Sequence, residues 1–111
     1  MLAPSPRLSD LDGFSIRAAD FRGSTLVSIC DEELIGKTVT EGRLTMHISR
    51  DFFYGEIVDG EEALRLMKIC SIVNLAGRRT VNLAIANKLG AKEAVREIEK
   101  VPFLMIYKFL G

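Results

Sequence analysis

Alternation of apolar and polar residues is the clearest signal in the first half of the chain. An apolar side chain at every second position over residues 14–18 and 43–49 predicts two half-buried strands. A further strand over residues 25–30 follows a short turn, so it is expected to form an antiparallel hairpin with the first. Residues 103–110 are apolar on both faces apart from Lys108, which is typical of a strand inside a sheet.

The second half of the chain shows the spacing of amphipathic helices. Asp59 caps a first helix, and Gly77 is expected to end it. Two further helices are predicted over residues 78–88 and 91–99, where apolar residues recur at three- and four-residue intervals. Earlier in the chain, Asp31 is expected to cap one short helical turn.

These elements predict an α+β protein with a single small mixed sheet of about four strands, covered by a layer of about three helices. The N-terminal hairpin, a third strand at 43–49 and a central C-terminal strand would build the sheet. Residues 1–12 carry no apolar pattern and predict a flexible N-terminal tail. Residues 13–111 would then form one globular domain, a usual size for a single folding unit.

Composition narrows the class of protein. The chain is 48% apolar and 27% charged, values that suit a globular domain with a core. No apolar run approaches the roughly 20 residues of a membrane span, and the N-terminus lacks the pattern of a secretory signal, so a cytoplasmic location is expected. The absence of Gln and Trp, with more Arg than Lys, favours a heat-tolerant source.

Side chains that could hold a metal or act as nucleophiles are few. With two cysteines and one histidine, Cys and His alone cannot build a four-ligand zinc site. Cys30 precedes the helical turn, but the acids at residues 31–33 oppose a thiolate, so an inert core thiol is expected. His47 would have to contact Cys30 directly to form a catalytic pair. We therefore predict no catalytic residue, cofactor or metal ligand.

Charge is distributed unevenly. Residues 31–62 hold nine acidic and three basic side chains, whereas residues 63–111 hold nine basic and three acidic ones. Basic side chains on helix exteriors can bind phosphate groups, and aromatic residues 52–54 could stack bases. The candidate phosphate contacts are Arg78, Arg79, Lys88 and Arg96. The chain's pI of about 6.6 is below that of dedicated nucleic-acid binders.

Several short motifs resemble one family in the same order along the chain. The strand that leads into Cys30-Asp31-Glu32-Glu33-Leu34 and then Gly36-Lys37 is similar to the opening motif of a conserved archaeal family catalogued as a domain of unknown function, number 424. Further similarities are Phe53-Tyr54-Gly55, Glu61-Glu62-Ala63-Leu64, Asn74-Leu75 with Gly77, and Val101-Pro102. Arg78-Arg79 departs from the acidic residue expected in that turn.

The resemblance covers roughly residues 13 to 109. It implies an α+β fold and an archaeal, cytoplasmic setting, and it supplies no mechanism. It also marks a family-motif surface at Asp31, Glu32, Glu33 and Lys37.

Three functions remain open at this point. The leading hypothesis is a non-enzymatic binding module that contacts structured RNA or a translation-related ribonucleoprotein. The alternative is a protein–protein interaction module that uses the acidic face at residues 31–33. A metal-assisted hydrolase, built on acids such as Asp51, Glu56 and Asp59, carries less weight because surface acids are usually solvated. The sequence leaves the oligomeric state open.

Overall fold

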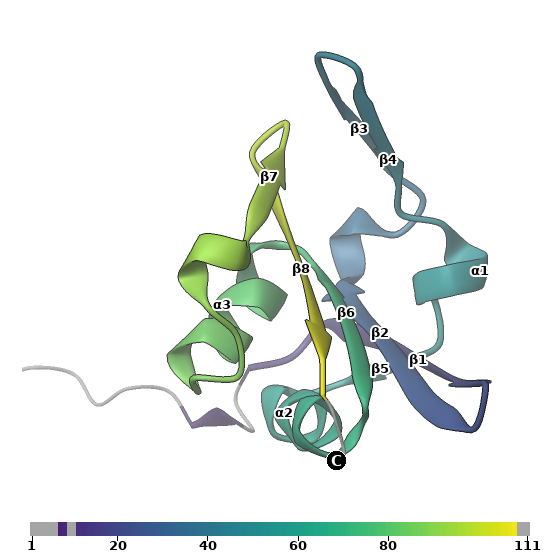
Figure 1. The fold of residues 1–111 in the computed structure, drawn as a ribbon, viewed down its shortest axis with the longest axis vertical. Helices are drawn as coiled ribbons and strands as arrows, with labels where there is room; N and C mark the ends of the chain where they lie inside the picture. The colour runs from purple at the N-terminus through teal and green to yellow at the C-terminus, as the bar shows by residue number, and fades with distance from the viewer. Residues whose placement is uncertain (1–6, 9–10, 109–111) are drawn as a thin grey trace, which may run out of the picture.

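A six-stranded sheet forms the centre of the protein. The structure, a computed structural model, describes residues 7–8 and 11–108. The strand order is β5-β1-β2-β6-β8-β7 (Figure 1). The bounds of these strands are β1 Phe14–Phe21, β2 Ser24–Asp31, β5 Glu56–Val58, β6 Ile72–Ala76, β7 Arg96–Ile98 and β8 Val101–Tyr107. All neighbouring strands are antiparallel except β2 and β6, which are parallel.

Helices cover both faces of this sheet. The helices are α1 (Arg50–Phe53), α2 (Gly60–Ile69) and α3 (Arg78–Ala86), with short 3₁₀ turns η2 (Glu32–Leu34) and η3 (Lys92–Ala94). α2 and α3 bury the main core against side chains such as Val27, Ile29 and Leu75. α1 lies on the opposite face (Figure 1). Its Phe53 packs there with Cys30 and Ala76. The α+β class and the number of three helices are confirmed, but α1 is not one of the predicted helices, and the helices do not form one layer.

The predicted sheet of about four strands is wrong in number, because β6 and β7 fall in predicted helices, β5 is not predicted, and the strand predicted at residues 43–49 lies outside this sheet. The helix that begins after Asp59 ends at Ile69, and Ile72–Ala76 forms β6 in the middle of the sheet. Val73 and Leu75 alternate into the core from β6, and β-branched residues favour this extended backbone. Tertiary burial therefore overrides the helical spacing that continues past Ile69.

The predicted third helix over residues 91–99 is also replaced, by the turn η3 and the edge strand β7. β7 and β8 form a hairpin whose loop is Glu99-Lys100, and both loop residues have positive φ, 52° and 68°. Such a two-residue turn matches the twist of antiparallel strands, but it usually contains Asn or Gly. Without those residues, the sequence carried no turn signal here.

The most regular predicted strand, at residues 43–49, is a strand outside the main sheet. β4 (Leu44–His47) pairs only with β3 (Thr38–Glu41), and all four β4 residues are exposed. The hairpin is tied to the β7–β8 turn by two hydrogen bonds. Thr40 N–H donates to Glu99 Oε1 at 2.9 Å, and Glu99 N–H donates to Glu41 Oε1 at 3.0 Å.

The N-terminal tail predicted for residues 1–12 falls largely outside the described residues. Where the structure describes it, Leu8 and Leu11 pack against the main core, and Leu11 C=O accepts a hydrogen bond from Gly60 N–H. Those two leucines therefore belong to the folded unit.

Ser28 of β2 provides a test of the sheet's packing. Its Oγ is buried and has no hydrogen-bond partner among the residues that the structure describes. We expect Ser28→Ala to leave the free energy of unfolding unchanged or raise it by up to about 1 kcal/mol, because an unsatisfied buried hydroxyl is costly. Urea denaturation measures this. Thr80→Val, which loses a hydroxyl bonded to Asp31, should instead lower the stability, and equal losses in both variants would contradict the assignment.

Candidate functional site

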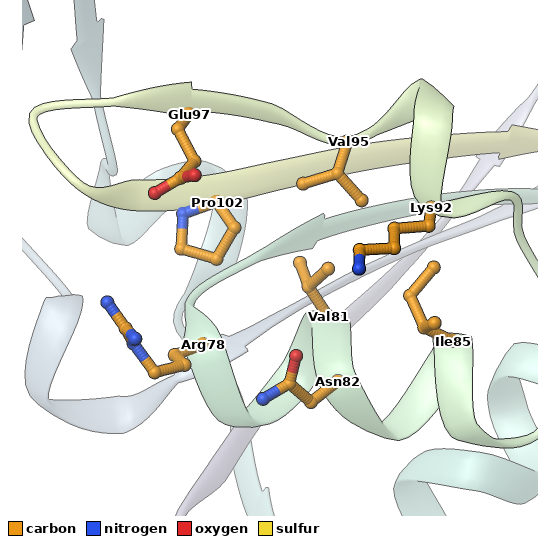
Figure 2. A pocket seen from close by; sticks show the side chains of 8 residues that line it. All are labelled: Arg78, Val81, Asn82, Ile85, Lys92, Val95, Glu97 and Pro102. Atoms are coloured by element: carbon orange, nitrogen blue, oxygen red, sulfur yellow. The ribbon is translucent and has the colours of Figure 1, made fainter.

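A groove lies between α3 and the strand β7 with its preceding turn. We call it the α3–β7 groove; its volume is about 470 Å³, within the range of small-ligand sites. Its lining residues are Arg78, Val81, Asn82, Ile85, Lys92, Val95, Glu97 and Pro102 (Figure 2). α3 supplies one wall because its residues 78, 81, 82 and 85 recur at helical spacing and share a face. Val95 and Glu97 share the groove-facing side of the opposite wall, since they are two residues apart.

The groove combines an apolar floor with charged ends. Val81, Ile85 and Val95 form the floor, and the polar side chains lie around it. Arg78 and Glu97 lie at one end, and Lys92 reaches in at the other (Figure 2). A flat apolar group could therefore rest on the floor while anionic oxygens contact Arg78 or Lys92.

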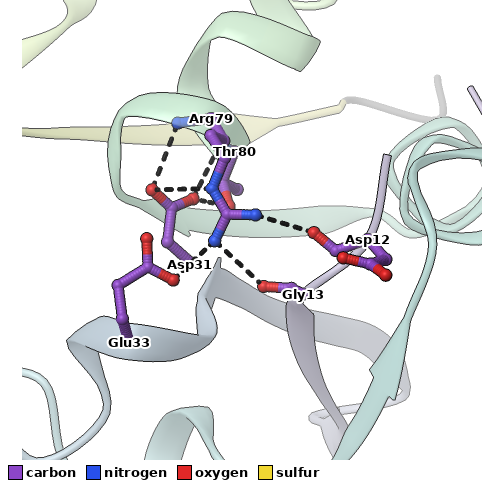
Figure 3. A network of polar contacts seen from close by, with 6 residues as sticks. All are labelled: Asp12, Gly13, Asp31, Glu33, Arg79 and Thr80. Carbon is purple, nitrogen blue, oxygen red and sulfur yellow. Dashed lines mark hydrogen bonds and ion pairs between the residues drawn. The ribbon is translucent and has the colours of Figure 1, made fainter. Parts of the chain in front are cut away.

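α3, the helical wall of the groove, is anchored by Asp31. The Asp31 carboxylate accepts hydrogen bonds from the backbone N–H of Arg79 (3.2 Å) and of Thr80 (2.9 Å), and from Thr80 Oγ1 (2.8 Å) (Figure 3). The residue before α3 is Gly77, which has no side chain for capping. Its φ is 108°, and an added Cβ would lie 2.5 Å from Asp31 Cγ. Asp31 thus caps a helix that begins 47 residues later, not the adjacent turn η2, where it makes no side-chain cap.

Arg79, one of the predicted phosphate contacts, is engaged in internal contacts. Its guanidinium donates to the backbone oxygens of Asp12 (2.7 Å) and Gly13 (3.3 Å) and pairs with the Glu33 carboxylate (Figure 3). It also lies 5.5 Å from the centroid of the Phe14 ring. Its side chain connects the N-terminal segment, η2 and α3, which gives Arg79 a structural role.

The structure does not bring the four predicted phosphate contacts together. Arg78 lines the groove at the start of α3, whereas Lys88 lies two residues beyond Ala86, the last residue of the helix. Arg96 lies on β7 between Val95 and Glu97, so its side chain points to the other face of the sheet. Of the four, only Arg78 lines the groove.

The family-motif surface is also divided. Asp31 is buried beneath α3, and Glu33 pairs with Arg79, which leaves Glu32 and Lys37 as its exposed residues without such partners. Within the described part of the chain, no group of three or more His, Cys, Asp or Glu side chains is placed to hold a metal ion. Asp51, Glu56 and Asp59, the acids considered for a hydrolase, therefore do not form such a group.

The cysteines match the expectation of inert core residues. Cys30 is fully buried, and burial, followed by the charges of Asp31 and Glu33, raises the pKa of its thiol to about 12. Burial also raises the pKa of Cys70, which is 3% exposed. His47 lies on the β3–β4 hairpin, where its Nδ1 is 2.8 Å from Thr38 Oγ1. The expected burial of Cys30 is confirmed.

Sequence reasoning missed the remaining polar residues of the groove and the cap beneath it. Lys92 and Glu97 fall within the helix predicted over residues 91–99, and the observed turn η3 and strand β7 place them opposite Asn82 of α3. The cap did leave a signal: a helix that follows Gly77 lacks its own capping side chain, so its first N–H groups need acceptors from elsewhere.

The geometry defines a small α+β protein with a groove on its surface. The chain belongs to the family described as Protein of unknown function (DUF424), whose model matches residues 20–109. No curated protein matches it. No helix of the described residues is both long enough and apolar enough to cross a membrane.

The fold recurs in a solved structure, the crystal structure of an uncharacterized conserved protein from Methanopyrus kandleri. The two structures superpose with a TM-score of 0.72, over 88% of this chain and 97% of that one. The sequence identity is 19%, so the likeness shows the fold alone.

Replacing Asp31 tests the cap. We expect Asp31→Ala to lower the free energy of unfolding by about 2–4 kcal/mol, because two N–H groups and a hydroxyl lose their buried acceptor. Glu32→Ala is a matched control, since Glu32 is an exposed neighbouring acid outside this network, and its stability should stay within about 0.5 kcal/mol of the wild type. Chemical denaturation of both variants measures the difference. A similar small effect for both would refute the cap's importance.

The raised pKa of Cys30 predicts an alkaline loss of stability. Its thiol would ionise near pH 9.0 in the unfolded chain but only near 12 in the folded protein. The contribution of the Cys30 thiol to the free energy of unfolding is therefore complete below pH 9, and it is lost as the pH rises towards 12. We expect wild type to lose stability more steeply over this range than Cys30→Ala, measured by denaturation at several pH values. Native protein should also resist thiol reagents at pH 8, and rapid labelling of Cys30 would contradict its burial.

Proposed function

We propose that this protein is a non-enzymatic, cytoplasmic binding module that contacts structured RNA, alone or within a translation-related ribonucleoprotein. The observation that carries the proposal is the α3–β7 groove, which joins an apolar floor to two cationic side chains, Arg78 and Lys92. A nucleotide has matching parts: a flat base, and a phosphate with anionic oxygens.

An unpaired nucleotide is the part of a structured RNA that fits the groove. Bases in unpaired segments are free to leave the stack and enter protein pockets, whereas paired bases are not. The base would lie on Val81, Ile85 and Val95, while Asn82 and Glu97 offer hydrogen-bonding groups to its edge. Arg78 presents a fork of donors that suits phosphate oxygens, and Lys92 supplies a second charge.

The groove also explains why the contact set differs from the one expected from sequence. Arg79 is already bonded to Glu33 and to backbone oxygens, so its removal would disturb the fold as well as any ligand. Lys88 lies beyond the far end of α3. Arg78 with Lys92 therefore replaces the four-residue set as the proposed phosphate site.

The test compares three variants, each of which removes one positive charge. A labelled RNA hairpin with an unpaired loop is titrated with Arg78→Ala, Lys92→Ala and Lys88→Ala at 50 and 200 mM salt. We expect each groove variant to weaken binding about tenfold and to reduce the steepness of the salt dependence, because one phosphate contact is lost. Lys88→Ala should bind within about twofold of wild type.

Two outcomes would count against the proposal. Equal losses in all three variants would indicate diffuse electrostatic attraction instead of a site, and a wild-type protein that does not bind the hairpin at 50 mM salt would remove RNA as the partner. Melting temperatures of the three variants serve as the control for folding, since all three side chains are exposed.

A further inference from the structure

The sheet face away from α2 and α3 carries two rows of side chains beyond the area that α1 covers. Side chains of directly paired residues lie on the same face of a sheet, so the register defines each row. The first row is Arg17, Ser28, Asn74 and Met105, and the second is Ala19, Leu26, Ile72 and Tyr107. We call these two rows the sheet platform. It spans strands β1, β2, β6 and β8.

Large side chains on the β8 side of the platform are exposed. Met105 is 48% exposed and Tyr107 is 61% exposed, and both lie beyond the part of β8 that pairs with β7, residues 101–103. Side chains on β8 that face α2 and α3 behave differently, since Leu104 is buried in the core. The β8 end of the platform thus presents apolar and aromatic surface, whereas its centre is closed at Ser28, which is fully buried.

Tyr54, which contacts two arginines, borders the β1 side of the platform. Arg17 Nη1 donates to the backbone oxygen of Tyr54 at 3.3 Å. The guanidinium of Arg50 lies 4.1 Å from the centroid of the Tyr54 ring, which is itself 43% exposed. A stacked guanidinium and an exposed ring both offer flat surfaces on which a base can stack.

The strands present positive charges on this face. Among the described strand residues on this face, the charged ones are Arg17 and Arg96. Arg96 pairs with Phe103 in the row next to the platform. The carboxylates of the neighbouring strands, Glu56 and Glu97, belong to the opposite face by alternation. α1 adds Arg50 and one acid, Asp51.

The width of the platform suits a short stretch of nucleotides. From β1 to β8 there are three strand spacings, which amount to about 14 Å at about 4.8 Å each. Sheets of four strands with exposed aromatic residues stack about two or three bases in known RNA-binding modules. The arginines at both borders are placed to contact the phosphates that flank such a segment.

We propose that the sheet platform binds an unpaired, single-stranded segment of RNA. Bases stack on Tyr107 and on the Tyr54–Arg50 pair, and Arg17 and Arg96 hold phosphates. Two features favour RNA over a protein partner: the aromatic side chains are exposed, and the charges on the strands of this face are exclusively positive. The inference concerns a second surface, separate from the α3–β7 groove, and either can be correct without the other.

The test uses a fluorescently labelled ten-nucleotide oligouridine at 50 mM salt, with fluorescence anisotropy as the readout. We expect Tyr107→Ala to weaken binding about five- to a hundredfold, the range for loss of one stacked base. Tyr107→Phe should retain most of the affinity, because the ring is kept. Arg96→Ala should weaken binding and lower the slope of log affinity against log salt by about 0.7, the value for one phosphate on a single strand.

Matched controls separate this surface from the groove and from the fold. Ile69→Ala removes another exposed apolar side chain, 62% exposed on α2, and should leave the affinity unchanged. Arg78→Ala with Lys92→Ala should also leave it unchanged, so a failure of the groove proposal is distinguishable from a failure here. Because Tyr107 is exposed, its truncation should not change the melting temperature appreciably.

Several results would overturn the platform. Undiminished affinity in Tyr107→Ala, or equal affinity for an RNA duplex whose bases cannot stack on the protein, would exclude base stacking at this face. Absence of oligouridine binding by the wild type would do the same. Concentration-dependent self-association in analytical ultracentrifugation that Tyr107→Ala abolishes would reassign the face to a second copy of this chain.

Discussion

The buried carboxylate of Asp31 joins the end of β2 to the start of α3, and the position of the α3–β7 groove depends on this contact. It stands at the end of β2, 4% exposed, and is stable there because three donors from α3 satisfy it. The positive end of the helix dipole favours a negative charge at that place. Through Arg79, the same network reaches Glu33 and the N-terminal segment.

This constraint fixes the wall of the groove. α3 has no capping side chain of its own, and Gly77 leaves the space that the Asp31 carboxylate fills. Arg78 therefore begins a helix whose position is set by a strand far away in sequence. Its side chain reaches the groove, while that of Arg79 bonds to Glu33 and to the backbone of residues 12 and 13. Two adjacent arginines, alike in sequence, have different environments because one helix turn points them in different directions.

The edge strand β7 separates the two proposed surfaces. Val95 and Glu97 face the groove, whereas Arg96 between them faces the side of the sheet that bears the platform. The β3–β4 hairpin is joined to the same edge by Glu41 and Glu99, so it borders the route from one surface to the other.

Local patterns were enough for the parts of the fold that depend on local physics. The hairpin of β1 and β2 follows from alternation and a turn, α3 from helical spacing, and β8 as an interior strand from its apolar residues on both faces. Its exposed residues Met105 and Tyr107 lie on the uncovered part of the sheet, which the sequence pattern did not reveal. β6 and β7 were missed, because short apolar segments suit either a helix or a strand until a neighbouring strand pairs with them.

The sequence by itself determined the α+β class, the family resemblance and the core position of Cys30, since composition, short motifs and residue type carry that information. Only the tertiary structure decided which charged side chains remain available to bind a ligand. Asp31 and Arg79 bind other parts of the chain, and Arg78 joins Lys92 across a groove. These arrangements join residues from 14 to 67 positions apart, and a pattern read along the chain records neighbours in sequence, not partners in space.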